Sequence, residues 1–364
     1  GSNENWPRHD AASCRAGAAT DSAMSPFVRR RRQAGWLALL ALLTTLASCT
    51  AHVATAAAER PVHEISARAL DWIEHHRATP DDGGLPDMID EAVSLRVFRD
   101  LALTAAQSEQ FAHLFEAQLT RLNTLSEFRR WVQRPHKTLI EHYHLVLAAY
   151  LMERAGLHSP MIGIIVQQAH RALGAATFEP PTVRLTTAVF LARLAGGATV
   201  DIDSLLAESL IGQLDRSRRI ITLPGANATA QQQRNTTWLL YALVHEVVAL
   251  TDFGRLAPSP WLDARRDTIA GILLAALPWA SAQNNWDLAA ELVVTLYFLG
   301  QPLDAAIQRV LEDLAANQQP DGSWGASATT SRPNKVRHTV LTATAALMAW
   351  RAWGERRPAH DTAR

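Results

Sequence analysis

Cysteine is almost missing from this 364-residue chain, which contains only Cys14 and Cys49. No cysteine follows residue 49, so the region after it has no disulfide, no cysteine nucleophile and no cysteine-ligated metal. An excess of positive charge is also missing, because 35 lysine and arginine residues balance 35 aspartate and glutamate residues. Domains that bind nucleic acid normally carry a basic excess, so we expect no nucleic-acid partner.

Long apolar runs are absent except near the N-terminus. There the basic stretch Arg29–Arg32 precedes the apolar run Trp36–Leu46. This run is shorter than the roughly 20 apolar residues of a transmembrane helix, and a basic stretch before a short apolar run is typical of a secretory signal. We therefore interpret residues 1–23 as a tag or an over-extended N-terminus and residues 24–48 as a signal peptide.

The apolar run ends in Leu46-Ala47-Ser48-Cys49, which resembles the bacterial lipobox. This resemblance implies that Cys49 is lipidated and that the protein is a membrane-anchored lipoprotein facing the periplasm or the cell exterior. The alternative is an ordinary signal cleaved after Ala54-Thr55-Ala56, which has the small residues that such cleavage requires. Both interpretations predict an exported protein.

Beyond residue 63 the apolar residues recur with a helical period, and no segment alternates as a β-strand does. The pattern predicts a single all-α domain over residues 63–354, after a linker at 49–62 and before a flexible tail at 355–364. The predicted helices lie near residues 63–78, 88–102, 107–131, 138–155, 160–174, 183–195, 203–214, 234–252, 261–278, 285–299, 303–317 and 335–352.

The even-numbered helices of this series begin about fifty residues apart and are the more apolar set. A repeat of this length is typical of an array of similar units, and a helix that is apolar on most sides must be buried. Six hairpins, each with one inner and one outer helix, predict an (α/α)6 barrel, or toroid. The alternative is an open superhelical solenoid of helix pairs.

The segment Asn317–Trp324 contains the sequence Gln-Pro-Asp-Gly-Ser-Trp. It resembles the Gln…Asp-Gly-Ser-Trp turn of the terpenoid cyclase and protein prenyltransferase superfamily, and this resemblance implies an α/α toroid. The chemistry of that superfamily is less well matched. The run Val200–Ser204 lacks one acid of the cyclase motif, the zinc-binding cysteine of the prenyltransferases is absent, and aromatic residues make up only 7% of the chain.

Charged residues fall in the middle of two inner helices. His245 and Glu291 each lie nine residues before a glycine that ends the helix, so they are predicted at the same depth and can face each other across a cavity. Asp287 lies one turn before Glu291 on the same face. Histidine and carboxylate side chains are suited to general acid–base catalysis. The predicted catalytic residues are His245, Glu291, Asp287, His142 and His338.

His245 and Glu291 are also candidate ligands for a divalent metal, since imidazole and carboxylate groups bind zinc, iron and manganese. Two alternatives remain open at this point. The pair can act without metal as an acid and a base, or it can be a buried hydrogen bond that fixes the register of two helices.

The two lysines of the chain both occur in an Arg-Pro-x-Lys sequence just before an inner helix. We interpret these segments as anion-binding loops at the mouth of the cavity, with solvated helix starts as the alternative. Further cations and aromatic residues are predicted to bind substrate. The predicted substrate-binding residues are Lys137, Lys335, Arg184, Arg337, Trp238, Tyr241 and Trp286.

These features favour an exported enzyme that acts on a glycan, a peptide or a lipid-like molecule by acid–base or metal-assisted chemistry. Paired carboxylates, with Asp90 and Glu91 facing Asp287 and Glu291, would suit a glycan. One alternative is a non-catalytic envelope lipoprotein that binds a ligand or a partner. A second is a terpene-cyclase-like or prenyl-binding protein with an aromatic-lined cavity.

Overall fold

The computed structural model describes residues 62–80, 84–175, 179–195, 201–216, 220–225, 228–324 and 333–355. All of them belong to one unit of the chain, residues 56–364, and only the backbone is described for residues 333–335. The predicted tag, signal peptide and lipidation site Cys49 lie outside the described residues. The linker before residue 62 and the tail after residue 355 lie outside them too.

Every described element is helical, which confirms the all-α class for this part of the chain; within the described ranges no strand occurs. None of these helices combines the length and the apolar composition needed to cross a membrane. The helices are α2 (Val62–His75), α3 (Gly84–Leu101), α4 (Ala105–Thr124), α5 (Ser126–Gln133), α6 (Leu139–Arg154), α7 (Met161–Ala175), α8 (Pro181–Ala192), α9 (Ile202–Glu208), α10 (Leu210–Leu214), α11 (Ala230–Leu250), α12 (Pro260–Asp263), α13 (Arg266–Ala282), α14 (Trp286–Phe298), α15 (Ala305–Ala316) and α16 (Pro333–Glu355).

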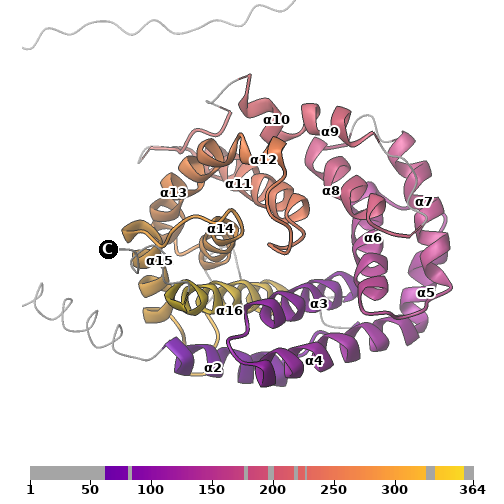
Figure 1. Ribbon diagram of the computed structural model, residues 1–364, viewed down its shortest axis with the longest axis horizontal. Helices are drawn as coiled ribbons and strands as arrows, with labels where there is room; N and C mark the ends of the chain where they lie inside the picture. The colour runs from indigo at the N-terminus through magenta and orange to yellow at the C-terminus, as the bar shows by residue number, and fades with distance from the viewer. Residues whose placement is uncertain are drawn as a thin grey trace, which may run out of the picture. The chain divides into compact units, whose positions relative to one another are not determined.

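Six of these helices pack against one another in a closed order. Helix α3 contacts α6, α6 contacts α8, α8 contacts α11, α11 contacts α14, α14 contacts α16, and α16 contacts α3 again. These are the six helices that the sequence predicts as the apolar set. Figure 1 shows α4, α5, α7, α13 and α15 on the outside of this set.

Burial separates the two sets of helices. In α14 every residue except Asp287 is buried, whereas in α7 only Ile165 and Ala169 are buried. A helix surrounded by others must be apolar on all sides, while an outer helix needs only one apolar stripe. The difference in burial therefore follows from the difference in composition that is visible in the sequence.

Three predicted helices are each divided in two in the structure. The predicted helix 203–214 is interrupted at Ser209, whose backbone is extended and whose hydroxyl accepts a hydrogen bond from the N–H of Gly212. This serine acts as an N-cap inside an apolar run and starts a new helix. Similar breaks occur at Leu125, between α4 and α5, and after Asp263, between α12 and α13.

The Gln-Pro-Asp-Gly-Ser-Trp turn joins the beginning of the described chain to its last hairpin. Gln318 donates from Nε2 to the carbonyl of Ile65 in α2 over 2.9 Å, and the indole of Trp324 donates to the carbonyl of Leu314 in α15 over 2.8 Å. Gly322 has a φ of 95°, and a Cβ at this position would lie 2.3 Å from the backbone oxygen of Arg68. Glycine is therefore required for α2 to pack this closely against the turn.

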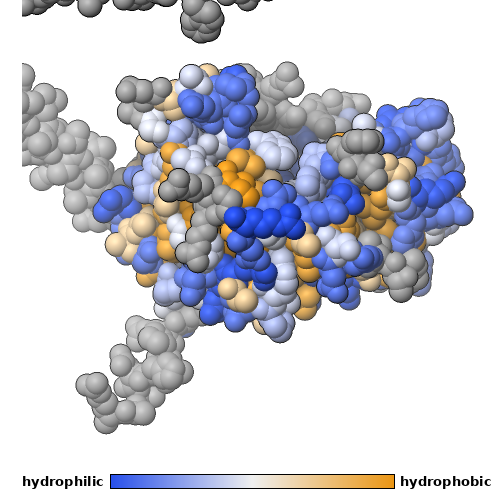
Figure 2. Space-filling view, turned by 90° about the horizontal axis from the view of Figure 1, so that it is seen from above, coloured by the Kyte–Doolittle hydropathy of each residue, from blue (hydrophilic) through white to orange (hydrophobic). Residues whose placement is uncertain are grey.

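The face seen in Figure 2 is mostly hydrophilic, with apolar areas that are separate from one another. Large apolar side chains that are exposed in the described residues include Ile140, Trp238 and Leu256. Scattered apolar residues of this kind are normal for protein surfaces. The surface thus offers no extended apolar patch among these residues, and the more distinctive feature is a cavity between the six inner helices.

Candidate functional site in the internal cavity

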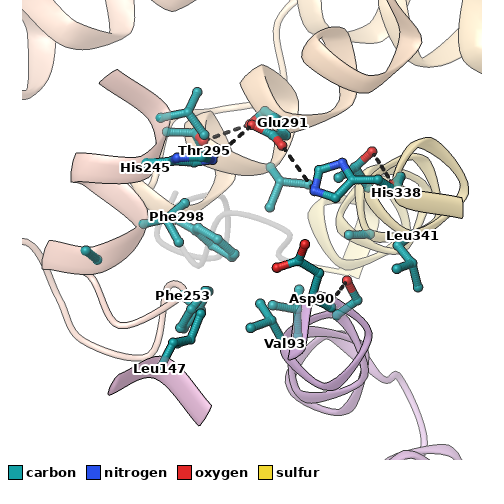
Figure 3. A pocket seen from close by; sticks show the side chains of 18 of the residues that line it. Asp90, Val93, Leu147, His245, Phe253, Glu291, Thr295, Phe298, His338 and Leu341 are labelled. Carbon is teal, nitrogen blue, oxygen red and sulfur yellow. Dashed lines mark hydrogen bonds and ion pairs between the residues drawn. The ribbon is translucent and has the colours of Figure 1, made fainter. Parts of the chain in front are cut away.

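All six inner helices contribute residues to one cavity of about 130 Å³, which is partly open to solvent. The loop after α11 closes part of it with Phe253 (Figure 3). The cavity therefore depends on segments that lie up to about 250 residues apart in the sequence. Its lining residues fall into a polar group and an apolar group. The charged or imidazole-bearing residues are Asp90, His245, Glu291 and His338, and the apolar ones include Val93, Val97, Leu147, Phe190, Val248, Phe253, Phe298, Leu341 and Ala345.

The two groups lie at different positions along the helices. On α14 Glu291 is followed two turns later by Phe298, and on α3 Asp90 is followed two turns later by Val97. Figure 3 shows His245, Glu291 and His338 close together, with Val93, Leu147 and Phe253 further from them. The cavity consequently has one polar end and one apolar end.

Glu291 stands between two histidines at the polar end. Its Oε2 lies 4.0 Å from Nε2 of His245, and its Oε1 lies 3.9 Å from Nε2 of His338. Both separations are too long for hydrogen bonds. The Glu291 residue is only 9% exposed, and among the described residues its Oε2 has no hydrogen-bond partner. A buried carboxylate oxygen without a donor is costly, so this atom is available to a bound group.

His338 is held in place by Asp287. Its Nδ1 lies 2.8 Å from Oδ1 of Asp287, and that carboxylate also accepts hydrogen bonds from the hydroxyls of Tyr241 and Thr342 over 2.7 and 2.9 Å. A carboxylate beside Nδ1 favours a proton on that nitrogen and orients the ring. The arrangement leaves Nε2 of His338 directed toward Glu291.

The protonation states at the polar end are set by burial and by neighbouring charges. Burial, together with the charge of Asp287, raises the pKa of Glu291 to about 8. Desolvation by the surrounding helices, together with nearby His338, lowers the pKa of His245 to about 4, although its ring keeps an accessible surface toward the cavity. Burial alone would lower the pKa of His338, but the charge of Asp287 and its hydrogen bond raise it well above its ordinary value. At neutral pH Glu291 is therefore protonated and His245 is neutral, while His338 is charged and paired with Asp287.

The predicted partnership of His245, Glu291, Asp287 and His338 is therefore present in the geometry. The side chain of His245 is 48% exposed and lines the cavity. The signal in the sequence was the equal depth of His245 and Glu291. It did not identify which histidine pairs with Asp287, because that depends on how α14 and α16 pack.

Asp90 and Glu91 are adjacent in sequence but have different surroundings. Asp90 directs its carboxylate into the cavity (Figure 3), and no described side chain donates a hydrogen bond to that carboxylate. Glu91 is fully buried on the other side of α3, where it forms an ion pair with Arg77 and accepts the N–H of Ala78 over 2.7 Å. Only Asp90 can contribute to the cavity, so the predicted pairing of Asp90 and Glu91 as one site is not found.

His142 lies away from the cavity, although it was predicted to be catalytic. It is 7% exposed and lies on α6, but it is not one of the cavity-lining residues. Its Nδ1 is buried without a partner among the described residues, and burial, together with the charge of Lys137, lowers its pKa to about 4. The residues that α6 does turn toward the cavity are Tyr143 and Leu147.

The predicted substrate-binding cations have partners outside the cavity. Lys137 donates to the side chain of Gln168 over 2.9 Å, and Arg184 pairs with Glu208 at 2.6 Å. Arg337 donates to the carbonyl of His76 over 2.9 Å and approaches Asp87 at 3.4 Å. These contacts join neighbouring helices and loops. The side chain of Lys335 lies outside the part that the structure describes.

The three predicted aromatic residues also lie in different surroundings in the structure. Trp238 is 54% exposed and Trp286 is buried, but neither lines the cavity. Tyr241 reaches the site indirectly, because its hydroxyl donates to Asp287. The aromatic residues that line the cavity were not predicted to do so. They are Tyr143, Phe190, Phe253 and Phe298.

A buried polar network lies behind the apolar end. Asp252 accepts hydrogen bonds from Arg96 and from the hydroxyl of Tyr150 over 2.8 and 2.7 Å, and Arg193 donates to the carbonyls of Ala249 and Leu250 at the end of α11. Asp252 and Phe253 both have positive φ values, of 50° and 57°. A positive φ is uncommon outside glycine and is an outlier for a bulky residue such as Phe253. The network around Asp252 holds the turn that places Phe253 in the cavity wall.

Comparisons with known proteins place the chain in a family without assigning an activity. Neither curated proteins nor solved structures include a match to the chain. One family model matches residues 66–348, which is more than half of the sequence and includes every residue that lines the cavity. The chain therefore belongs to the family described as a domain of unknown function, DUF6895.

Proposed function

We propose that residues 63–354 form an (α/α)6 toroid of six helical hairpins. The closed order of contacts from α3 through α16 and back to α3 supports this architecture. The contact between the Gln318 turn and α2 supports it further, because that contact joins the first and last hairpins. An open solenoid would have no reason to bring these two ends of the chain together.

We propose that the protein is an enzyme and that its cavity is an active site for proton transfer. The observation that carries this proposal is the position of Glu291, buried between two histidines with an unpartnered oxygen beside the cavity. A structural glutamate would have its hydrogen-bonding capacity filled by the protein. Buried acids next to imidazoles in a cavity are the usual components of acid–base catalysis.

In this proposal Glu291 donates a proton to the substrate or accepts one from it. His338 supplies a positive charge beside Glu291, and Asp287 positions that ring. His245 lies on the opposite side of Glu291 and is neutral at physiological pH, so it is available as a base. A cavity of about 130 Å³ admits only a small molecule or one group of a larger glycan, peptide or lipid-like substrate.

The proposal is tested by incubating the purified protein with a mixture of small metabolites and following each compound by mass spectrometry. At least one compound should be converted by the wild-type protein, and Glu291→Gln should slow that conversion by about 100-fold or more. Glu246→Gln is a matched control, because Glu246 is a buried glutamate on the neighbouring helix that does not line the cavity. Conversion that continues unchanged in Glu291→Gln would refute the proposed role.

A metal-assisted reaction is the second candidate function, and it also rests on geometry. Ligand atoms of Asp287, Glu291 and His338 all lie within 4.8 Å of one another, as a metal site requires. His245 would approach the same carboxylate from the other side. Metal analysis of the purified protein, beside Glu291→Gln and His245→Ala, separates the two candidates. Stoichiometric metal that both substitutions remove would favour metal-assisted chemistry, and metal-free protein that remains active would favour proton transfer alone.

We further propose that the protein is exported and anchored to a membrane through lipidated Cys49. The basic stretch, the short apolar run and the lipobox-like sequence before Cys49 support this proposal. Cys49→Ala should move the protein from the membrane fraction to the soluble fraction if the lipid is the anchor. A variant that remains in the membrane fraction would contradict lipidation at this cysteine.

A further inference from the structure

Hydrogen-bond acceptors outnumber donors at the polar end of the cavity. The carboxylate of Asp90 points into the cavity (Figure 3), and Oε2 of Glu291 is buried without a partner among the described residues. His338 is the charged donor nearby, but its Nδ1 is engaged by Asp287 and its Nε2 lies 3.9 Å from Oε1 of Glu291, which is too far for a hydrogen bond. The polar end therefore requires a bound group that donates several hydrogen bonds or carries positive charge.

The other charged and titratable groups that face the polar end do not make its net charge positive. His245 lies on α11 and Tyr143 on α6, and both side chains are uncharged in their ordinary forms near neutral pH. The positive charge of His338 is balanced by Asp287. Asp90 on α3 is left as a negative charge without a described counter-ion, and an anionic ligand would be repelled by it.

The apolar end has the size and character for a small hydrocarbon group. It is lined by the side chains of Phe190, Phe253 and Phe298, with aliphatic side chains around them. The cavity measures about 130 Å³, close to the roughly 150 Å³ of an apolar cavity that holds benzene. Because this volume includes the polar end, it limits the whole ligand to about one six-membered ring or branched alkyl group with a small head group.

The distance between the two ends also limits the ligand. Asp90 and Val97 are seven residues apart on α3, and seven residues of α-helix rise about 10 Å. A ligand that reaches from Asp90 to the side chains around Val97 is therefore limited to about 10 Å in length, which leaves room for a head group joined closely to one ring. A long chain would not fit within this depth.

We propose that the cavity binds a small primary amine, with the ammonium group between Asp90 and Glu291 and a benzene-sized apolar group against the phenylalanines. An ammonium group has three donors and no acceptor, so it matches the Asp90 carboxylate and the acceptor oxygen of protonated Glu291. A neutral hydrocarbon would leave the buried Oε2 of Glu291 without a donor, which is unfavourable. This inference rests on the proposed function only in taking the same cavity as the site, because binding can be measured without turnover.

The test compares three probes that share one ring and differ in the head group. Binding of benzylamine, benzyl alcohol and toluene to the purified full-length protein is measured by calorimetry or by NMR titration. Benzylamine should bind at least about tenfold more tightly than benzyl alcohol, in line with the strength of charge-assisted hydrogen bonds. Toluene should bind no more tightly than the alcohol.

Asp90→Asn should weaken benzylamine binding about tenfold and change benzyl alcohol binding by less than about threefold. Asp87→Asn is the matched control. Asp87 lies one turn earlier on α3 and faces Arg337 instead of the cavity, so the substitution removes the same charge without changing the site. Circular dichroism of both variants checks that they fold.

Three results would overturn the inference. They are equal binding of benzylamine and benzyl alcohol by the wild-type protein, no binding of any probe, and equal weakening by Asp87→Asn and Asp90→Asn. The first two need no variant, so the inference stays testable even if Asp90→Asn fails to fold. Amine binding without any Glu291-dependent turnover would contradict the proposed function alone. Turnover of a neutral compound without amine binding would contradict this inference alone.

Discussion

Two buried glutamates on neighbouring helices have opposite surroundings. Glu246 on α11 is completely buried, and its carboxylate accepts three hydrogen bonds: from the Thr182 hydroxyl over 2.7 Å, and from the backbone N–H groups of Leu210 and Ile211 over 2.9 Å each. Glu291 on α14 is buried nearly as deeply, but the described residues give its Oε2 no donor. Burial alone therefore does not distinguish a structural carboxylate from a functional one.

The two carboxylates have different roles in the protein. Glu246 caps the start of α10 and joins it to α8 and α11, so its hydrogen bonds contribute to the fold. Glu291 contributes no such connection through its carboxylate and instead faces a cavity. Unfilled hydrogen-bonding capacity beside a cavity is therefore the signal of function here.

Loss of activity in Glu291→Gln is the largest effect we expect. Glutamine has the size of glutamic acid but cannot exchange a proton, so turnover should fall by about 100- to 10,000-fold, or about 3–5 kcal/mol in transition-state free energy. The free energy of unfolding should change by less than about 1 kcal/mol, because the carboxyl group has no donor to lose. Steady-state kinetics and urea unfolding measure the two quantities.

A loss of stability instead of activity in Glu291→Gln would remove the distinction between the two glutamates. His338→Asn provides a control at the same site, since it removes the positive ring while leaving Glu291 in place. It should also lower turnover, and normal turnover in this variant would contradict the role of His338.

Glu246→Gln should have the opposite effect. The amide NH₂ group cannot accept the N–H groups that the carboxylate accepts, so at least one buried donor loses its partner. We expect a decrease of about 2–3 kcal/mol in the free energy of unfolding, with kcat changed by less than about threefold in the folded protein. Chemical denaturation and kinetics below the unfolding transition provide the measurements. Unchanged stability would mean that these hydrogen bonds contribute little to the fold.

His142 tests whether an unpartnered buried atom is enough to indicate function. Its pKa is lowered from 6.5 to about 4 in the folded protein, so the unfolded chain binds a proton more readily. Stability should therefore fall as the pH drops below about 6.5, by about 1–2 kcal/mol between about pH 7.5 and about pH 5. His142→Leu should remove this part of the pH dependence and leave turnover near the wild-type value.

The measurement is urea unfolding of both proteins at the two pH values. The difference between wild type and variant isolates His142 from the other groups that titrate in this range. A large loss of turnover in His142→Leu would show that a buried imidazole outside the cavity is needed for activity, which would weaken the criterion of a cavity-facing group.

The smallest effect is expected for Thr182→Val. This change removes one of the three donors to Glu246 and keeps the shape of the side chain close to that of threonine. The expected cost is about 1 kcal/mol in the free energy of unfolding, measured by the shift of the urea midpoint. A cost as large as that of Glu246→Gln would mean that the hydroxyl carries most of the stabilisation.

Helix positions were largely predictable from the sequence. Each of the twelve predicted helices overlaps an observed one, because the apolar period and the helix-ending glycines are local signals. The breaks at Leu125 and Ser209 were missed. An N-cap serine inside an apolar run is hard to distinguish from a helical residue until its hydroxyl is seen to accept a backbone N–H.

The site was predictable only in part. His245 and Glu291 were identified as charged or imidazole-bearing residues at equal depth on apolar helices, where burial requires a reason, and Asp287 was identified one turn before Glu291 on the same face. Glu246 was passed over because its donors lie on segments far from it in the sequence. Trp238 was assigned to the cavity because it lies on an inner helix, but it lies in the first half of α11 and is exposed.

The sequence by itself determined the helical class, the fifty-residue repeat and the set of helices that are buried, since these depend on the residues within each helix. Only the tertiary structure decided which charged side chains meet. His338 pairs with Asp287, the carboxylate of Glu246 accepts three hydrogen bonds, and one oxygen of Glu291 has no donor among the described residues. All three outcomes depend on the rotation and depth at which separate helices pack. Those quantities are set by contacts among many residues distant in sequence, and no local pattern records them.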